Sequence, residues 1–134
     1  MTNALQPRFT VTVAAVVLDE RRRVLLLKHS LRGGSGWGIP GGFLSADEQP
    51  EEGLRRELRE EVGLEITAVE LALVRSVNNA RQVQIVYRCL ADGEPRARSI
   101  EVAQCDWFAP DGLPDQLSRS QRAIISEALK QRLV

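Results

Sequence analysis

The sequence has few of the residues that mark special protein classes. Its 134 residues include two cysteines, Cys89 and Cys105, and a single histidine, His29. Two cysteines cannot form the several disulfides of a small secreted scaffold, and no Cys-x-x-Cys pair indicates a zinc site. We therefore expect one compact domain spanning residues 1–134, of a size that buries about two thirds of its unfolded surface.

The chain also lacks a net charge and long apolar runs. Eighteen basic residues balance eighteen acidic ones, which disfavours a nucleic-acid binder that works through a basic field. Its apolar runs are far shorter than the ~20 residues of a membrane span. Residues 1–7 do not resemble a secretory signal. We expect a soluble, cytoplasmic protein that forms no stable complex with nucleic acid or membrane, and the sequence leaves a homodimer open.

The first third of the chain predicts two strands and a loop. Phe9–Leu18 is rich in Val and Thr and becomes apolar on both faces, as in a strand at the middle of a sheet. Val24–His29 predicts a second strand, paired with the first as a hairpin across a polar turn. Leu31–Gly42 (LRGGSGWGIPGG) is dense in glycine and predicts a loop.

A helix is expected over Pro50–Val62. Proline suits the first helical turn, Glu51 and Glu52 complement the helix dipole there, and Gly63 supplies a C-terminal cap. Further strands are expected at Ile66–Val77, Gln82–Leu90 and Val102–Phe108, followed by an amphipathic helix from Ser118 to Leu133. This order predicts an α/β fold with a mixed sheet covered on both sides.

Three glutamates in the Pro50–Val62 helix break the ordinary rules of helix design. Glu57 and Glu61 are four residues apart beside the apolar seam, and Glu60 is next to both. Like charges at this spacing repel, and the C-terminal half of a helix disfavours carboxylates. Clustered carboxylates suit a hard divalent cation. An Arg- and Glu-rich helix that is merely a solvated surface remains the alternative on composition alone.

The surrounding residues carry a specific motif. Gly42–Leu64 reads GFLSADEQPEEGLRRELREEVGL. It fills every fixed position of the Nudix box, GX5EX7REUXEEXGU with U an aliphatic residue. Trp37–Gly42 (WGIPGG) is similar to the usual lead-in to that box, and Trp107-Phe108 with Leu113-Pro114 is also similar to MutT-type members. The sequence therefore resembles the Nudix hydrolase superfamily over nearly its whole length.

The resemblance implies a fold and a reaction class. The fold is the Nudix α/β/α sandwich around a mixed β-sheet. The reaction is metal-dependent hydrolysis of a nucleoside diphosphate linked to another moiety X. The implied cofactor is Mg²⁺, with Mn²⁺ as the alternative ion, and the implied partner is a small nucleotide substrate.

The resemblance also assigns roles to the carboxylates. Glu57, Glu60 and Glu61 are the expected metal ligands and catalytic residues, together with the main-chain carbonyl of Gly41. One of the glutamates, Glu57 first, is the candidate general base. Arg56, grouped with the catalytic residues, is expected to orient or balance Glu57. A plain helix salt bridge to Glu52 or Glu60 is the alternative, and it is compatible with that role.

Other positions have expected supporting roles. Gly42 and Gly63 serve the geometry of the motif, and Glu48 is expected to brace the loop against the helix or to reach the metal through water. Many relatives use a further acidic ligand from a downstream loop. Glu101 is the first candidate for that ligand and Glu94 the second.

Three cations near the glycine-rich loop are candidates for binding substrate phosphate: Lys28, His29 and Arg32. Lys28 and His29 at a strand end can equally be a pair of surface cations. Trp37 is expected to pack within the loop, and Cys89 to be a core thiol.

The substrate is not specified by the sequence. Markers of ADP-ribose hydrolases and of dinucleoside-polyphosphate hydrolases are absent at their usual places, near Asn78–Arg81. Hydrolysis of a (d)NTP to (d)NMP and pyrophosphate is the first expectation. ADP-ribose, nucleotide sugars and dinucleoside polyphosphates are the alternatives, and an inactive nucleotide-binding regulatory module is the alternative from a different class.

Overall fold

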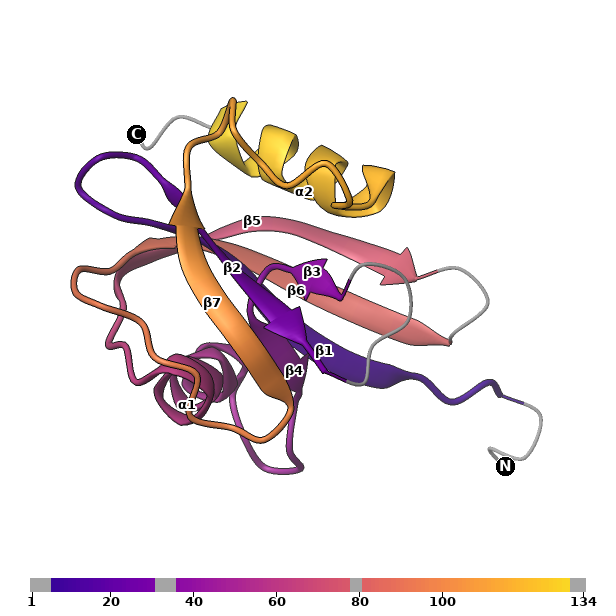
Figure 1. Cartoon of the computed structure of the whole chain (residues 1–134). Coiled ribbons are helices and arrows are strands. Elements are labelled where there is room, and N and C mark those ends of the chain that lie inside the picture. Colours follow the sequence, from indigo (N-terminus) through magenta and orange to yellow (C-terminus); the bar gives the residue numbers. More distant parts are fainter. Residues whose placement is uncertain (1–5, 31–35, 78–80, 131–134) are drawn as a thin grey trace.

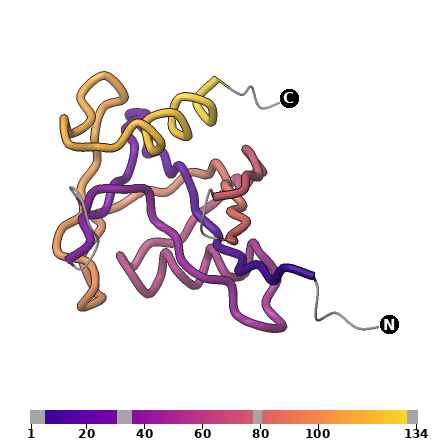
Figure 2. Tube along the Cα trace, turned by 90° about the vertical axis from the view of Figure 1, so that its right-hand side faces the viewer, coloured from indigo at the N-terminus to yellow at the C-terminus, as the bar shows by residue number. Residues whose placement is uncertain are grey.

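A mixed β-sheet lies between two helices in the computed structural model of the chain (Figure 1). The structure describes residues 6–30, 36–77 and 81–130. Helix α1 (Pro50–Val62) lies below the sheet in Figure 1 and helix α2 (Arg119–Lys130) lies above it. The tube in Figure 2 shows the same three layers from the side. The predicted α/β/α sandwich is confirmed.

Strand β1 (Thr10–Leu18) is the centre of the sheet, as its apolar sequence predicted. Its alternating side chains supply both cores. Val13, Ala15 and Val17 pack on the α1 side with Leu54 and Leu58. The residues between them pack on the α2 side: Ala14, Val16 and Leu18, with Ile124, Ile125 and Ala128. Burial of these side chains on both faces is the main force holding the layers together.

The strands pair in the order β3-β2-β1-β6-β5, with β4 paired to β1 and β7 to β2. Their bounds are β2 Val24–His29, β5 Thr67–Val77, β6 Gln82–Leu90 and β7 Val102–Phe108. Strands β1 and β6 are parallel and the other pairs are antiparallel. The predicted hairpin of β1 and β2 is present, although β2 pairs along its length with β7 rather than with β1.

The glycine-rich segment is not entirely a loop, which corrects the sequence prediction. Trp37–Gly38 forms β3 on β2, and Gly41–Phe43 forms β4 on β1. Glycine has no side-chain pattern that would indicate a strand, so these short strands depend on their neighbours for pairing. Trp37 packs its ring edge-on against Phe108, with ring centroids 5.2 Å apart, as expected of a packing residue.

Both helices form where the sequence predicted them. Helix α1 has Pro50 in its first turn, and Gly63 follows it with φ +71°, a left-handed cap that glycine adopts readily. The described part of the second helix ends at Lys130, so the predicted extension to Leu133 lies outside the described residues. Neither helix in the described part of the chain has the length and apolar character needed to cross a membrane.

The two cysteines are free thiols. Cys89 is buried in the core on the α1 side, as predicted, and burial raises the pKa of its thiol to about 12. A thiol with such a pKa is inert at neutral pH.

Candidate active site

The glutamates of α1 face a cavity of about 400 Å³ between that helix and β4. Residues from five parts of the fold surround it. They are His29, Gly41, Gly42, Phe43, Ser45, Arg56, Glu57, Glu60, Glu61, Ser99 and Glu101. The structure thus brings Glu57, Glu60, Glu61, Arg56, Gly41 and Glu101 to one place, although the sequence separates them by up to 60 positions.

Arg56 connects the carboxylates of this cavity. Its guanidinium donates two hydrogen bonds to Glu48, of 2.7 and 3.0 Å, and one each to Glu57, at 3.0 Å, and Glu60, at 3.3 Å. It also reaches the main-chain carbonyl of Phe43 at 3.3 Å. These contacts place the guanidinium between Glu48 and Glu57, and a guanidinium suits this bidentate arrangement better than an ammonium would.

Glu48 braces the loop to the helix through that same arginine. Its carboxylate accepts the bonds from Arg56 and also accepts the Ser45 N–H at 3.1 Å. These bonds favour the ionised form and hold the pKa of Glu48 down at about 2. The carboxylate is therefore charged at all physiological pH values and acts as a fixed anchor for Arg56.

The surroundings of Glu57 disfavour its ionised form. Burial raises its pKa, and the nearby charges of Glu61 and Glu60 raise it further, although the bond from Arg56 opposes the shift. The side chain is 15% exposed, so little water is available to screen those charges. A carboxylate with a raised pKa holds a proton more readily than an ordinary glutamate, which suits the candidate general base.

Glu61 is buried, and its partner is a residue that the sequence analysis did not connect with it. His29, at the end of β2, has its Nε2 atom 3.5 Å from Glu61 Oε2. Glu61 Oε1 and His29 Nδ1 are both buried and have no hydrogen-bond partner within the described residues. A buried carboxylate oxygen without a partner is costly, so a ligand that binds it has a strong driving force.

No group of three or more His, Cys, Asp or Glu side chains converges on one point within residues 6–30, 36–77 and 81–130. Arg56 holds Glu57 and Glu60, and His29 holds Glu61. One guanidinium nitrogen of Arg56 contacts both Glu57 and Glu60, whereas Glu61 is contacted from β2. The set is nevertheless one of hard oxygen donors around a single cavity, and one of those oxygens is buried and unpartnered, which fits Mg²⁺ or Mn²⁺.

The two candidate loop glutamates lie in different places. Glu101 lines the cavity with the helix glutamates, and its main-chain carbonyl accepts the Ser30 N–H at 2.9 Å. Glu94 instead lines another cavity, beside Asp19 and Glu20. The geometry favours Glu101 over Glu94 as the additional acidic residue.

The candidate phosphate-binding cations are not gathered in this cavity. His29 lies in it, whereas Lys28 points its ammonium group toward the ring of Trp37, 6.0 Å from the ring centroid. The pairing of β2 with β7 is irregular between these two residues. Arg32 lies outside the described residues.

Gly41 and Gly42 allow close packing of the backbone against β1 and α1. They belong to strand β4, and neither has a positive φ. A Cβ atom on Gly41 would lie 2.2 Å from the main-chain oxygen of Val13, and one on Gly42 would lie 2.5 Å from the carboxylate of Glu57. The bare backbone at these positions leaves room for the Glu57 side chain and for a ligand.

These two glycines should respond differently to alanine. Gly41→Ala collides with the β1 backbone, which cannot move aside, so we expect a lower melting temperature and loss of folded protein. Gly42→Ala collides with the end of a flexible side chain, so we expect a folded protein in which Glu57 is displaced and turnover falls about tenfold or more. Thermal melting and turnover measured side by side check this. Gly112→Ala, where a Cβ has ordinary contacts at 3.7 Å, is the control; equal melting temperatures for all three variants would contradict the packing argument.

Comparison with known proteins identifies the family to which this geometry belongs. The chain matches the NUDIX domain over residues 8–128. The chain belongs to the Nudix family. It is 32% identical over 123 residues to a "MutT-like protein" of Streptomyces ambofaciens, an alignment that covers 92% of this chain and 79% of that protein. It is therefore a Nudix hydrolase.

Two further proteins are similar to the chain. A crystal structure of a MutT NUDIX hydrolase from Burkholderia pseudomallei superposes with a TM-score of 0.78 at 29% identity, covering 90% of this chain and 98% of that one. An "8-oxo-dGTP diphosphatase" of Proteus vulgaris is 38% identical over 60 residues, which cover 43% of this chain and 54% of that protein. The Nudix box resemblance is thus confirmed at the level of family and fold.

Some residues that line the cavity were not predicted from the sequence. Phe43, Ser45 and Ser99 line the cavity, and His29 contacts Glu61 rather than solvent. A serine in a loop or a phenylalanine in a short strand carries no local signal of a site. His29 lies where the pairing of β2 with β7 is irregular, so strand alternation alone does not place its side chain.

Proposed function

We propose that this Nudix hydrolase cleaves the pyrophosphate linkage of a nucleoside diphosphate joined to another group, with (d)NTP to (d)NMP and pyrophosphate as the first candidate reaction. One observation carries the proposal. The cavity that holds the glutamates and a neighbouring uncharged cavity share Gly41, Gly42 and Phe43 in their walls. A nucleotide can therefore lie across bare backbone, with its phosphates beside the acidic residues and its nucleoside in the uncharged cavity.

Glu57, Glu60 and Glu61, with the Gly41 carbonyl and Glu101, are the groups that would hold Mg²⁺ or Mn²⁺. All are oxygen donors on one cavity, as these hard cations require. The buried, unpartnered Oε1 of Glu61 supports the assignment because a cation would satisfy it. When bound, a divalent cation neutralises phosphate charge and lowers the pKa of a water molecule.

The chain's own residues do the positioning. Glu48 fixes Arg56, and Arg56 in turn orients Glu57. The raised pKa of Glu57 supports its role as general base toward the attacking water, since a proton accepted there is held more firmly than on an ordinary glutamate. His29 holds Glu61 from β2, at 3.5 Å. We therefore assign His29 a positioning role toward Glu61.

The names of the relatives support the choice of substrate class. One is a MutT-like protein and another is an 8-oxo-dGTP diphosphatase, the latter similar over less than half of this chain. A (d)NTP is consequently the first candidate substrate, and ADP-ribose, nucleotide sugars and dinucleoside polyphosphates are the alternatives. The intact set of glutamates argues against a module that only binds nucleotides.

A substrate panel tests the proposal. NTPs, dNTPs, ADP-ribose, nucleotide sugars and dinucleoside polyphosphates are each incubated with the protein and Mg²⁺, and the products are separated by chromatography. We expect nucleoside monophosphate from at least the NTP or dNTP group. Turnover confined to a phosphomonoester, with every anhydride untouched, would refute the proposed function.

Glu101 and Glu94 provide a matched pair of variants. If Glu101 contributes an oxygen to the site, Glu101→Gln should lower kcat by about tenfold or more, whereas Glu94→Gln, in a different cavity, should leave kcat unchanged. Steady-state kinetics at saturating Mg²⁺ check this. Equal kcat for Glu101→Gln and the unmodified protein would show that the helix glutamates suffice.

A further inference from the structure

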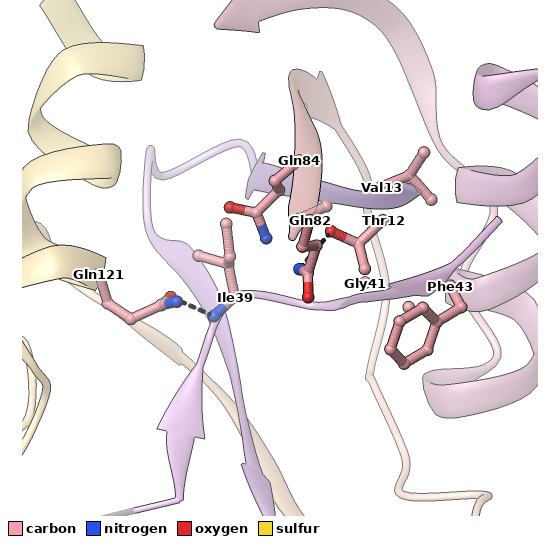
Figure 3. Close-up of a pocket in the computed structure, with 10 residues that line it drawn as sticks. Thr12, Val13, Ile39, Gly41, Phe43, Gln82, Gln84 and Gln121 are labelled. Atoms are coloured by element: carbon pink, nitrogen blue, oxygen red, sulfur yellow. Dashed lines mark hydrogen bonds between the residues drawn. The ribbon is translucent and has the colours of Figure 1, made fainter. Parts of the chain in front are cut away.

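The uncharged cavity beside the glutamates has a defined hydrogen-bonding character. It measures about 230 Å³, less than the ~300–1,000 Å³ of pockets that enclose drug-sized ligands, so it suits one part of a nucleotide. Its apolar walls include Ala14 and Ile39, and Phe43 stands at the boundary with the acidic cavity (Figure 3). The polar groups come from Thr12 and from three glutamines, Gln82, Gln84 and Gln121.

The orientation of the Gln121 amide is fixed by a main-chain group. Its Oε1 accepts the N–H of Ile39 at 2.9 Å, drawn as a dashed line in Figure 3. A backbone N–H can only donate, so the amide oxygen must face Ile39 and the NH₂ group must face the other way. That NH₂ group makes no hydrogen bond within the described residues.

The Gln84 amide is fixed in the same way by an arginine. Its Oε1 accepts a hydrogen bond of 2.8 Å from Nε of Arg75, and a guanidinium has donors only. Arg75 is itself held by Ser120 of α2, whose Oγ lies 3.0 Å from the guanidinium. The Gln84 NH₂ group therefore also remains without a hydrogen bond in the part of the chain that the structure describes.

Gln82 does not add to this argument. Its NH₂ group donates to Thr12 Oγ1 at 2.9 Å. A hydroxyl both donates and accepts, so this amide can turn over and present either end. The fixed character of the cavity thus rests on Gln84 and Gln121, which together offer up to four N–H donors.

We propose that this cavity selects nucleobases whose edge carries carbonyl oxygens, that is, 6-oxopurines and 4-oxopyrimidines, over the corresponding amino bases. The inference rests on the proposed function, since it assumes that the base lies in this cavity. A carbonyl oxygen accepts from the fixed NH₂ groups. The exocyclic amino group of adenine or cytosine would place donor against donor and leave both unpaired, which is the kind of mismatch that polar sites reject most strongly.

Matched substrate pairs test the selection. ITP and ATP differ at position 6 of the purine, and UTP and CTP differ at position 4 of the pyrimidine. We expect kcat/KM to favour the oxo member of each pair by roughly tenfold, the effect of about one hydrogen bond. A preference in only one pair would show that the cavity recognises only that ring type, purine or pyrimidine. Equal kcat/KM within both pairs would overturn the inference while leaving pyrophosphate hydrolysis intact.

Variants can reverse the preference without removing the anchors. Gln84→Glu keeps an oxygen for Arg75, Gln121→Glu keeps an oxygen for Ile39, and each puts an acceptor where the NH₂ group was. We expect each variant to lower the oxo-to-amino ratio of kcat/KM by about tenfold. The ratio cancels any general repulsion between the added charge and the phosphates. Gln116→Glu, at an exposed position outside the cavity, is the control and should keep the ratio of the unmodified protein; an unchanged ratio in both cavity variants would contradict the inference.

A binding experiment separates this inference from the proposed function. Calorimetry with IMP against AMP, and UMP against CMP, in the presence of EDTA reports base recognition with no hydrolysis. Preferential binding of IMP and UMP by a protein that hydrolyses none of the triphosphates would retain the inference and refute the function. Equal binding within both pairs would refute the inference whatever the activity.

Discussion

The Glu61→Gln variant should lose at least about a hundredfold in kcat while keeping its fold. Glu61 is the most buried of the helix glutamates, with 10% of its side chain exposed, and its Oε1 atom has no hydrogen-bond partner in the described chain. Replacing the carboxylate by an amide removes the charge that a divalent cation would meet there. It also removes the repulsion between Glu61 and Glu57.

Turnover should therefore fall without a loss of thermal stability. In metal-free buffer we expect the melting temperature of Glu61→Gln to equal or exceed that of the unmodified protein. Glu52→Gln is the matched control, because Glu52 is an exposed glutamate in the first turn of the same helix. It should change neither property. Full kcat in Glu61→Gln would show that Glu61 has no catalytic role. Failure of the variant to fold would show that Glu61 is needed for the structure instead.

Removal of divalent cations is the second change with a large expected effect. Excess EDTA should abolish turnover, and Mg²⁺ or Mn²⁺ should restore it, because the phosphates and the cavity glutamates are all negative and repel each other without a cation. Binding should also stabilise the fold. At a cation concentration a hundred times Kd the expected gain is about 2.7 kcal/mol, which corresponds to a rise in melting temperature of several degrees.

The stability readout makes this prediction independent of any substrate. The rise in melting temperature with Mg²⁺ should be present in the unmodified protein and in Glu52→Gln, and strongly reduced in Glu61→Gln. Ca²⁺ serves as a further probe, since it also prefers oxygen ligands but accepts longer distances. Full turnover in excess EDTA, or the same Mg²⁺-dependent rise in Glu61→Gln, would contradict a cation at these glutamates.

Much of the fold was predictable because its signals are local. Helix α1 begins at Pro50 and ends before Gly63, two residues whose backbone preferences act without help from the rest of the chain. The bounds of β2, β6 and β7 also agree with their apolar patterns. Strands β3 and β4 were missed because their glycines gain a strand conformation only through pairing with β1 and β2.

The candidate site was predictable only as far as one motif reaches. The box indicates Glu57, Glu60 and Glu61 on one helix, and helical spacing alone puts them together. The contact of His29 with Glu61 and the presence of Glu101 in the same cavity depend on how β2 and the loop before β7 meet α1. The amides of Gln84 and Gln121 are fixed by Arg75 and Ile39, which lie in other parts of the chain. No sequence pattern predicts these hydrogen bonds.

The identity of the products is the most direct measurement of the central claim, that the acidic cavity cleaves a pyrophosphate linkage. An NTP is hydrolysed with Mg²⁺ in ¹⁸O-labelled water, and the products are analysed by ³¹P NMR and mass spectrometry. We predict nucleoside monophosphate and pyrophosphate in equal amounts, with label in one of them. Accumulation of NDP with release of labelled orthophosphate would contradict the account. It would show attack at the terminal phosphorus and cleavage of the β–γ anhydride instead of the α–β anhydride.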